Sequence, residues 1–242
     1  MIQKRDLLVL CGPEKDFFVR AGEGKMGTDH GLLDLDALVG MSPGDILPSH
    51  SGRPFVVRLP RATDFFSLAK RSGAPMLPRD IGLVIGLTGM KKTDVILDAG
   101  TGSGIAALFF GGIARHVTTC ESRIEFVKAA EETIKDAGLS DTVTVVHGDI
   151  LLATGTFDII HLDLPVTKAH VSHAYSLLVP GGYLACYSPF IEQMALVYDA
   201  ASGQFDEVTS HETIGREMDR SERGTRPSTR ICHSGYLTIA RK

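Results

Sequence analysis

The segment VILDAGTGSGIAALFF, residues 95–110, constrains the fold of this chain more than any other segment. An apolar run ends at Asp98, and glycines follow at alternate positions, Gly100, Gly102 and Gly104, before a second apolar run. A strand that ends in a glycine-rich turn and continues as a helix is a common binding place for nucleotide-like ligands in α/β sheets. We therefore expect this turn to hold such a ligand.

The chain after residue 80 alternates strand-like segments with amphipathic helical ones, which predicts a parallel sheet with helices on both faces. The strands are expected at Val95–Asp98, His116–Glu121, Val143–His147, Asp158–Leu162 and Gly182–Ser188. Two further strand-like runs, residues 205–215 and 234–241, have no helix between them. We expect them to form a terminal hairpin that adds an antiparallel edge to the sheet.

The first 60 residues have a different pattern, with short β-type runs such as DLLVLCG, DFFVRAG and PFVVRLP separated by glycine- and proline-containing turns. This pattern predicts a small β-rich domain over residues 1–60. Residues 61–242 form the second predicted domain, which begins with the helix-compatible run ATDFFSLAKRSG.

The composition is that of a globular protein, with 43% hydrophobic and 22% charged residues in 242. The longest apolar runs are too short to span a bilayer, and the first residues lack the apolar core of an export signal. We expect a cytoplasmic protein without membrane contact. The four cysteines form no CxxC pair and are expected to be reduced thiols: Cys11, Cys120, Cys186 and Cys232.

No metal site is expected. His170 and His173 have i,i+3 spacing, but no carboxylate motif completes them, so we interpret them as part of a helix surface.

The net charge of −4 does not by itself indicate a nucleic-acid-binding protein, but the charge is unevenly distributed. The segment Gly215–Lys242 carries seven Lys or Arg residues against three acidic ones. Local charge determines the field that a phosphate backbone meets, so this segment is a candidate RNA contact. A solvated basic face is the alternative interpretation.

The glycine spacing distinguishes between nucleotide-like ligands. A dinucleotide fingerprint needs a small residue where this chain has Ile105. The run instead fits acid-x-G-x-G-x-G, which is typical of Rossmann-like methyltransferases that use S-adenosylmethionine (SAM). In this interpretation SAM contacts the loop Gly100, Thr101, Gly102, Ser103 and Gly104, and Asp98 stabilises the positively charged amino-acid end of SAM.

Two further acids follow in register. Glu121 ends the next strand, where a carboxylate accepts hydrogen bonds from ribose hydroxyls, and Asp149 follows the third strand, near the expected adenine edge. Taken singly, Glu121 is equally consistent with a surface acid and Asp149 with a helix cap. Their order along the chain favours SAM binding.

The whole chain resembles the tRNA (adenine-N1)-methyltransferases that modify the T-loop, of the bacterial and archaeal homotetrameric type. The resemblance is carried by MGTDHGLLDLDALVGMSPGD, by SGRPFVVRLPRATDFFSLAKRSGAPMLPRD, by LDAGTGSG and by RPSTRICHSGYLTIARK. It implies a class I SAM-dependent methyltransferase domain, α/β with a mostly parallel seven-stranded sheet and an antiparallel edge hairpin. It also implies methylation of adenosine 58 of tRNA, with 57 as the alternative position, and a homotetramer.

The same resemblance implies roles for individual residues. Asp163 stands where the family has its catalytic aspartate, although a cap of the turn after the strand is its alternative role. Arg79, Lys168 and the C-terminal arginines are candidate phosphate contacts, and His233 is either a pocket residue or a structural histidine at the start of a strand. The full set of expected substrate-binding residues is Pro78, Arg79, Asp80, Lys168, Arg226 and His233.

One departure concerns the acceptor. After Asp163 the family has Leu-Pro-Glu-Pro-Trp, whereas this chain reads Leu-Pro-Val-Thr-Lys and contains no tryptophan. An aromatic side chain there could hold an extracted base by stacking. Two alternatives therefore remain open: a SAM-dependent methyltransferase of a small molecule or protein, and a non-catalytic tRNA-binding subunit.

Overall fold

The computed structural model describes residues 1–69, 75–229 and 233–242. The chain divides into two compact units, Met1–Lys70 and Arg71–Lys242. The division therefore falls after helix α1 (Ala62–Leu68), whereas the sequence pattern places the boundary between residues 60 and 61. The physical reason is that Phe65 of α1 is buried and its ring lies 5.2 Å from the ring of Phe18 in the first unit.

The first unit is rich in β-structure. A four-stranded antiparallel sheet has the order β2-β1-β6-β5, and β3 and β4 form a separate hairpin that is followed by a short 3-10 helix, η1. Leucine side chains and Phe55 fill the core of this unit. The elements are β1 (Leu7–Cys11), β2 (Asp16–Arg20), β3 (Lys25–Thr28), β4 (Gly31–Asp34), η1 (Leu35–Leu38), β5 (Ile46–Pro48) and β6 (Pro54–Arg58).

The second unit contains a seven-stranded sheet in the order β12-β15-β11-β10-β7-β8-β9. The five strands from β11 to β9 are parallel, and β15 and β12 pair antiparallel at one edge. The mostly parallel sheet and the terminal hairpin are both confirmed. The strands are β7 (Val95–Ala99), β8 (His116–Glu121), β9 (Val143–His147), β10 (Phe157–Leu162), β11 (Leu178–Ser188), β12 (Glu207–Glu212) and β15 (Tyr236–Arg241).

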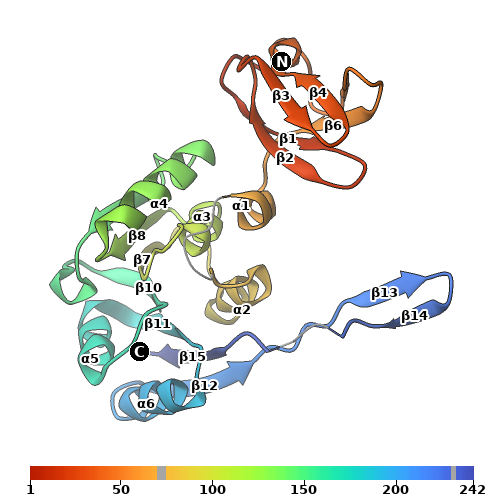
Figure 1. Ribbon diagram of the computed structural model, residues 1–242. Coiled ribbons are helices and arrows are strands. Elements are labelled where there is room, and N and C mark those ends of the chain that lie inside the picture. The colour runs from red at the N-terminus through yellow and green to blue at the C-terminus, as the bar shows by residue number, and fades with distance from the viewer. Residues whose placement is uncertain (70–74, 230–232) are drawn as a thin grey trace. The chain divides into compact units, whose positions relative to one another are not determined.

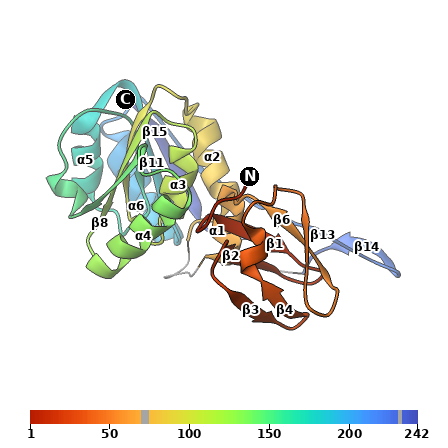
Figure 2. The same ribbon diagram turned by 90° about the horizontal axis from the view of Figure 1, so that it is seen from above.

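Helices lie on both sides of this sheet (Figures 1 and 2). Helix α3 contacts α2 and α4, and α5 contacts α6, so the two sets form separate layers. Apolar side chains of the strands, α5 and α6 make one continuous core. The helices are α2 (Pro78–Thr88), α3 (Ile105–Gly111), α4 (Ile124–Asp136), the 3-10 helix η2 (Ile150–Leu152), α5 (Lys168–Leu177) and α6 (Ile191–Ser202).

The strand order places a topological switch point beside β7. The chain continues from β7 to β8 and β9 on one side, then returns to β10 and β11 on the other. In open α/β sheets, ligands bind beyond the carboxyl ends of the strands at such a point. The residues that follow β7 and β10 are therefore the expected site.

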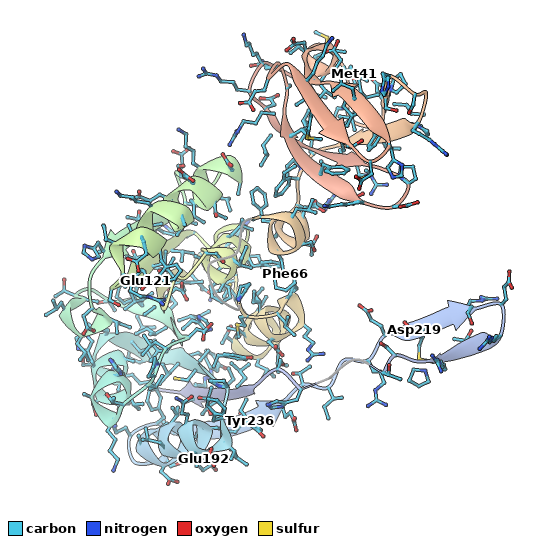
Figure 3. All side chains as sticks on the ribbon, in the orientation of Figure 1. Met41, Phe66, Glu121, Glu192, Asp219 and Tyr236 are labelled. Carbon is cyan, nitrogen blue, oxygen red and sulfur yellow. The ribbon has the colours of Figure 1, made fainter. Side chains whose placement is uncertain are left out.

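The sequence pattern did not predict a second hairpin, which lies between β12 and β15. It consists of β13 (Met218–Ser221) and β14 (Gly224–Pro227), and each residue of both strands is exposed. Figure 3 shows the side chains of this hairpin, with Asp219 labelled. None of the described helices has the length and apolar character that a membrane span requires.

Candidate active site

The loop between β7 and α3 is built by glycines with positive φ, namely 89° at Gly100, 53° at Gly102 and 81° at Gly104. Side-chain-bearing residues rarely adopt this region. At Gly100 the requirement is also steric, because a Cβ atom there would lie 1.9 Å from the carbonyl oxygen of Asp163. The Asp163 N–H donates to the Ala99 carbonyl at 2.9 Å. The glycine loop and the turn after β10 are thus packed backbone to backbone.

Two pockets meet at this contact. The larger one, about 350 Å³, is lined by the ends of β8 and β10 and by the segment after β9. The smaller one, about 220 Å³, lies over the glycine loop and the start of α3. Gly100, Arg123 and Asp163 line both pockets. This arrangement suits an elongated ligand whose two ends occupy different pockets and whose centre lies beside Asp163.

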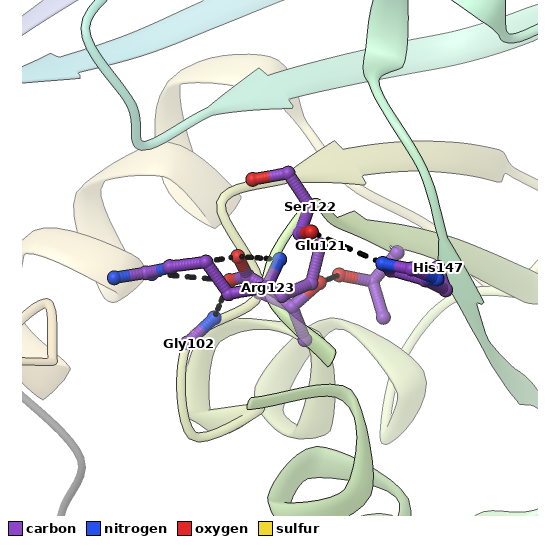
Figure 4. Close-up of polar contacts among 7 residues, drawn as sticks. Gly102, Glu121, Ser122, Arg123 and His147 are labelled. Carbon is purple, nitrogen blue, oxygen red and sulfur yellow. Dashed lines mark hydrogen bonds and ion pairs between the residues drawn. The ribbon is translucent and has the colours of Figure 1, made fainter. Parts of the chain in front are cut away.

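Glu121 lies at the carboxyl end of β8, where Figure 3 labels it, and lines the larger pocket. It accepts hydrogen bonds from the Gly102 N–H at 3.0 Å and from the backbone and guanidinium of Arg123 (Figure 4). Burial alone would raise the pKa of Glu121, but these hydrogen bonds hold that pKa below its usual value. Glu121 is thus a buried, ionised acceptor in the lining of the larger pocket.

Arg123 is the exposed partner in this pair. Its side chain is more than half exposed, whereas that of Glu121 is buried. Its guanidinium lies over the Phe126 ring at 3.8 Å and donates to both Glu121 oxygens. A ligand with adjacent hydroxyl groups can take the same two oxygens when the guanidinium moves aside.

Asp149 and Asp163 complete the acidic lining of the larger pocket. Asp149 caps η2 by accepting from the Leu151 N–H at 2.9 Å. Burial and the nearby Asp98 raise the pKa of Asp163 to about 6, although His161 opposes the shift. Asp163 is consequently a carboxylate that becomes protonated in the mildly acidic range.

A second polar group lies where α2 begins. Asp80 is buried, which raises its pKa against the opposing effects of Ser234, Arg79 and His233. The Tyr187 hydroxyl donates to the Ser234 carbonyl at 2.6 Å. Burial, with Asp80 and Asp163 nearby, raises the pKa of Tyr187 to about 12. Tyr187 thus lies near both carboxyls.

Sequence reasoning missed Tyr187. The available signal was its place near the carboxyl end of β11, the edge at which Asp163 and Glu121 also lie.

The other residues expected from the sequence lie outside the two pockets. The described lining residues do not include Asp98, whose oxygens are bonded to His161 and Thr119. Arg79 donates to the Gly215 carbonyl at 2.9 Å, and His233 pairs with Glu212 at 2.7 Å. The remaining ones occupy the glycine loop, the ends of helices or the exposed hairpin: Gly104, Pro78, Lys168 and Arg226.

This chain is similar to known proteins over most of its length. The model of a family described as the tRNA methyltransferase complex GCD14 subunit matches residues 67–225. The tRNA (adenine(57)-N(1)/adenine(58)-N(1))-methyltransferase TrmI of Methanocaldococcus jannaschii is 30% identical to this chain, over 94% of the chain and 91% of the relative.

Solved structures give the same fold. A SAM-dependent O-methyltransferase from Thermotoga maritima aligns with a TM-score of 0.91 at 25% identity, over 100% of this chain and 94% of that one. The tRNA (m1A58) methyltransferase TrmI from Aquifex aeolicus aligns with a TM-score of 0.84 at 21% identity, over 100% and 98%. At that identity the second likeness concerns the fold alone.

Proposed function

The chain belongs to the family of the tRNA methyltransferase complex GCD14 subunit, and from this premise we propose that it transfers a methyl group from SAM to N1 of an adenine in the T-loop of tRNA. We propose position 58 as the target, with 57 as the alternative. The observation that carries the proposal is the place of Asp163, a carboxylate at the boundary that the two pockets share.

The two pockets fit the methyl donor. SAM, when bound, supplies a methyl group on a positively charged sulfur. Glu121 and Asp149 both line the larger pocket, where Glu121 would accept from the ribose hydroxyls and Asp149 would lie beside the adenine. The glycine loop lines the smaller pocket, which takes the methionine end. With SAM bound in this way, its methyl group would lie at the shared boundary beside Asp163.

The chemistry on the acceptor side needs alignment more than proton transfer. The N1 lone pair of adenine forms the new N–C bond while the S–C bond breaks and its electron pair stays on sulfur. No general base is required, so most of the acceleration comes from orientation. Asp163 accepts a hydrogen bond from the adenine N6 amino group and stabilises the positive charge that develops on the ring.

We propose that Asp80 and Tyr187, near the start of α2, contact the base that is extracted from the tRNA. Asp80 and Asp163 are both close enough to Tyr187 to raise its pKa. Pro78 and Arg79 are the first residues of α2, the helix that contains Asp80, and His233 lies near Asp80. Lys168 and Arg226 are exposed and are our proposed contacts to tRNA phosphates. We propose that the protein acts in the cytoplasm, where tRNA is found.

We also propose that the protein assembles as a homotetramer through the β13–β14 hairpin. A two-stranded hairpin with all strand residues exposed is marginally stable by itself, and its edges offer unpaired backbone groups. Pairing with the same hairpin of another copy satisfies one edge and joins two chains, and two such pairs make the tetramer that the family resemblance implies. Light scattering is expected to give four times the 26.0 kDa chain mass. A monomer in solution would contradict this assembly.

The test of function is methylation of an unmodified tRNA transcript, followed by nucleoside analysis by mass spectrometry. We expect N1-methyladenosine, and its loss when the T-loop adenines are replaced. SAM binding measured by calorimetry separates the alternatives. Binding without tRNA methylation favours a small-molecule or protein acceptor. tRNA binding without SAM binding favours a non-catalytic subunit.

Replacement of Glu121 by glutamine is expected to weaken SAM binding by about 10- to 100-fold, because hydrogen bonds to an ionised acceptor are worth about 1.5–3 kcal/mol. Glu125→Gln is the matched control, since Glu125 is exposed in the first turn of α4. Calorimetry measures both. Equal SAM affinity in the two variants would rule out the ribose role of Glu121.

A further inference from the structure

His161 is a buried titratable residue that the proposed reaction does not use. It lies in β10, two residues before Asp163, and is 0% exposed. Its ring contacts the Phe110 ring edge-on, with 5.2 Å between the ring centres. The described lining residues of the two pockets do not include it. An imidazole in this place is therefore explained neither by solvent exposure nor by ligand contact.

His161 is the first member of a polar row that crosses three adjacent strands. His161 in β10 is in register with Asp98 in β7, and Asp98 is in register with Thr119 in β8. The His161 Nδ1 and Asp98 Oδ1 atoms are 2.6 Å apart, and the Thr119 hydroxyl donates to Asp98 Oδ2 at 2.5 Å. Register thus places the three side chains on one face of the sheet.

The row ends in the glycine loop. The hydroxyls of Thr119 and Thr101 are 2.5 Å apart. A hydroxyl has one proton, and Thr119 gives its proton to Asp98, so Thr101 is the donor in this bond. A carboxylate only accepts, so Nδ1 of His161 carries the proton that it shares with Asp98. Thr101 lines the smaller pocket.

In the part of the chain that the structure describes, His161 is bonded through one ring nitrogen only, which is an unfavourable arrangement for a residue whose sole role is stability. Its Nε2 atom is buried and has no hydrogen-bond partner among the described residues. An unpartnered buried polar atom is costly, and an apolar side chain would avoid that cost. Only the Nδ1 side of the ring is bonded, and that side faces Asp98. The hydrogen bond from Nδ1 to the Asp98 carboxylate therefore accounts for a histidine at this position.

We propose that His161 is a positioning residue for the methyl donor: by holding the Asp98 carboxylate, it fixes Thr119, Thr101 and with them the glycine loop in the conformation that receives SAM. The inference rests on the proposed function in that SAM is the ligand of this loop. It also gives Asp98 an indirect role, through the loop, in place of direct contact with the amino-acid end of SAM.

The test compares His161→Asn with His161→Gln. The asparagine amide nitrogen takes the place of Nδ1 and keeps the donor to Asp98, whereas the glutamine amide nitrogen lies one bond further, near the place of Nε2. SAM affinity measured by calorimetry is expected to change by less than about threefold in His161→Asn and to fall by at least about tenfold in His161→Gln. Melting curves and far-UV circular dichroism verify that both variants are folded.

Wild-type SAM affinity in His161→Gln would overturn the proposal, as would equal weakening in the two variants. If His161→Gln does not fold, Thr119→Val decides, because valine has the shape of threonine but breaks the row between Asp98 and Thr101. At least about fivefold weaker SAM binding is expected there, and unchanged binding would overturn the proposal. If the wild-type chain itself binds no SAM, the proposed function fails rather than this inference alone.

Discussion

Replacement of Asp163 by alanine is expected to lower kcat for tRNA methylation by about 10²–10³ while SAM affinity stays nearly unchanged. Asp163 lines both pockets at their shared boundary, so in our proposal it faces the reacting atoms. Its carboxylate meets a neutral adenine before transfer and a cationic ring as transfer proceeds. An interaction that is stronger in the transition state than in the ground state affects kcat more than substrate binding.

The pH dependence provides the control for this prediction. Because burial and Asp98 raise the pKa of Asp163 to about 6, the carboxylate becomes protonated as the pH falls through that value. Turnover by the wild type is then expected to fall about tenfold for each pH unit below about pH 6. The Glu121 carboxylate, whose pKa is lowered, remains ionised there. Asp163→Asn has no such group and is expected to lose this acidic limb.

Single-turnover kinetics across pH 5–8 measure both effects. Wild-type turnover in Asp163→Ala, or an unchanged acidic limb in Asp163→Asn, would remove Asp163 from the mechanism.

Replacement of Gly100 by alanine is expected to abolish measurable SAM binding and to destabilise the fold. The φ of 89° costs a residue with a side chain about 1–2 kcal/mol. The new Cβ would also lie 1.9 Å from the Asp163 carbonyl oxygen, and overpacking of this kind costs about 1–3 kcal/mol. Because that oxygen belongs to backbone, relief requires the glycine loop and the turn after β10 to move apart. The two pockets share this contact, so both change shape.

The midpoint of thermal unfolding is expected to fall by about 5–20 °C in Gly100→Ala, at about 2–4 °C for each kcal/mol. Gly86→Ala is the matched control. Gly86 is exposed in α2, a Cβ there meets nothing within 4 Å, and alanine favours a helix by about 1 kcal/mol. Scanning calorimetry and SAM titration follow both variants. A Gly100→Ala protein that melts and binds SAM as the wild type does would show that the loop tolerates a side chain.

The elements that form the sheet were predictable because their signals are local. Apolar runs with turn residues at their ends marked the five parallel strands, and glycines at alternate positions marked the loop after β7. The same logic placed Glu121 and Asp163 at the carboxyl edge, since the ends of parallel strands lie side by side. Fold class and family membership are both confirmed.

The β13–β14 hairpin gave no such signal. Its strands are polar and fully exposed, so no alternation between a buried and a solvated face is present in the sequence. The place of α1 was also not readable locally, because the pairing of Phe65 with Phe18 joins residues far apart in the chain.

The sequence by itself determined which residues end strands and where the backbone must turn without a side chain, because periodicity and glycine conformation act over a few residues. Tertiary structure decided which of those residues touch. Strand register put His161 beside Asp98 and Thr119, and so turned Asp98 from the pocket toward the core row. The fold also brings Tyr187 of β11 near Asp80 of α2 and near Asp163 after β10. No local pattern encodes contacts between residues so far apart in the sequence.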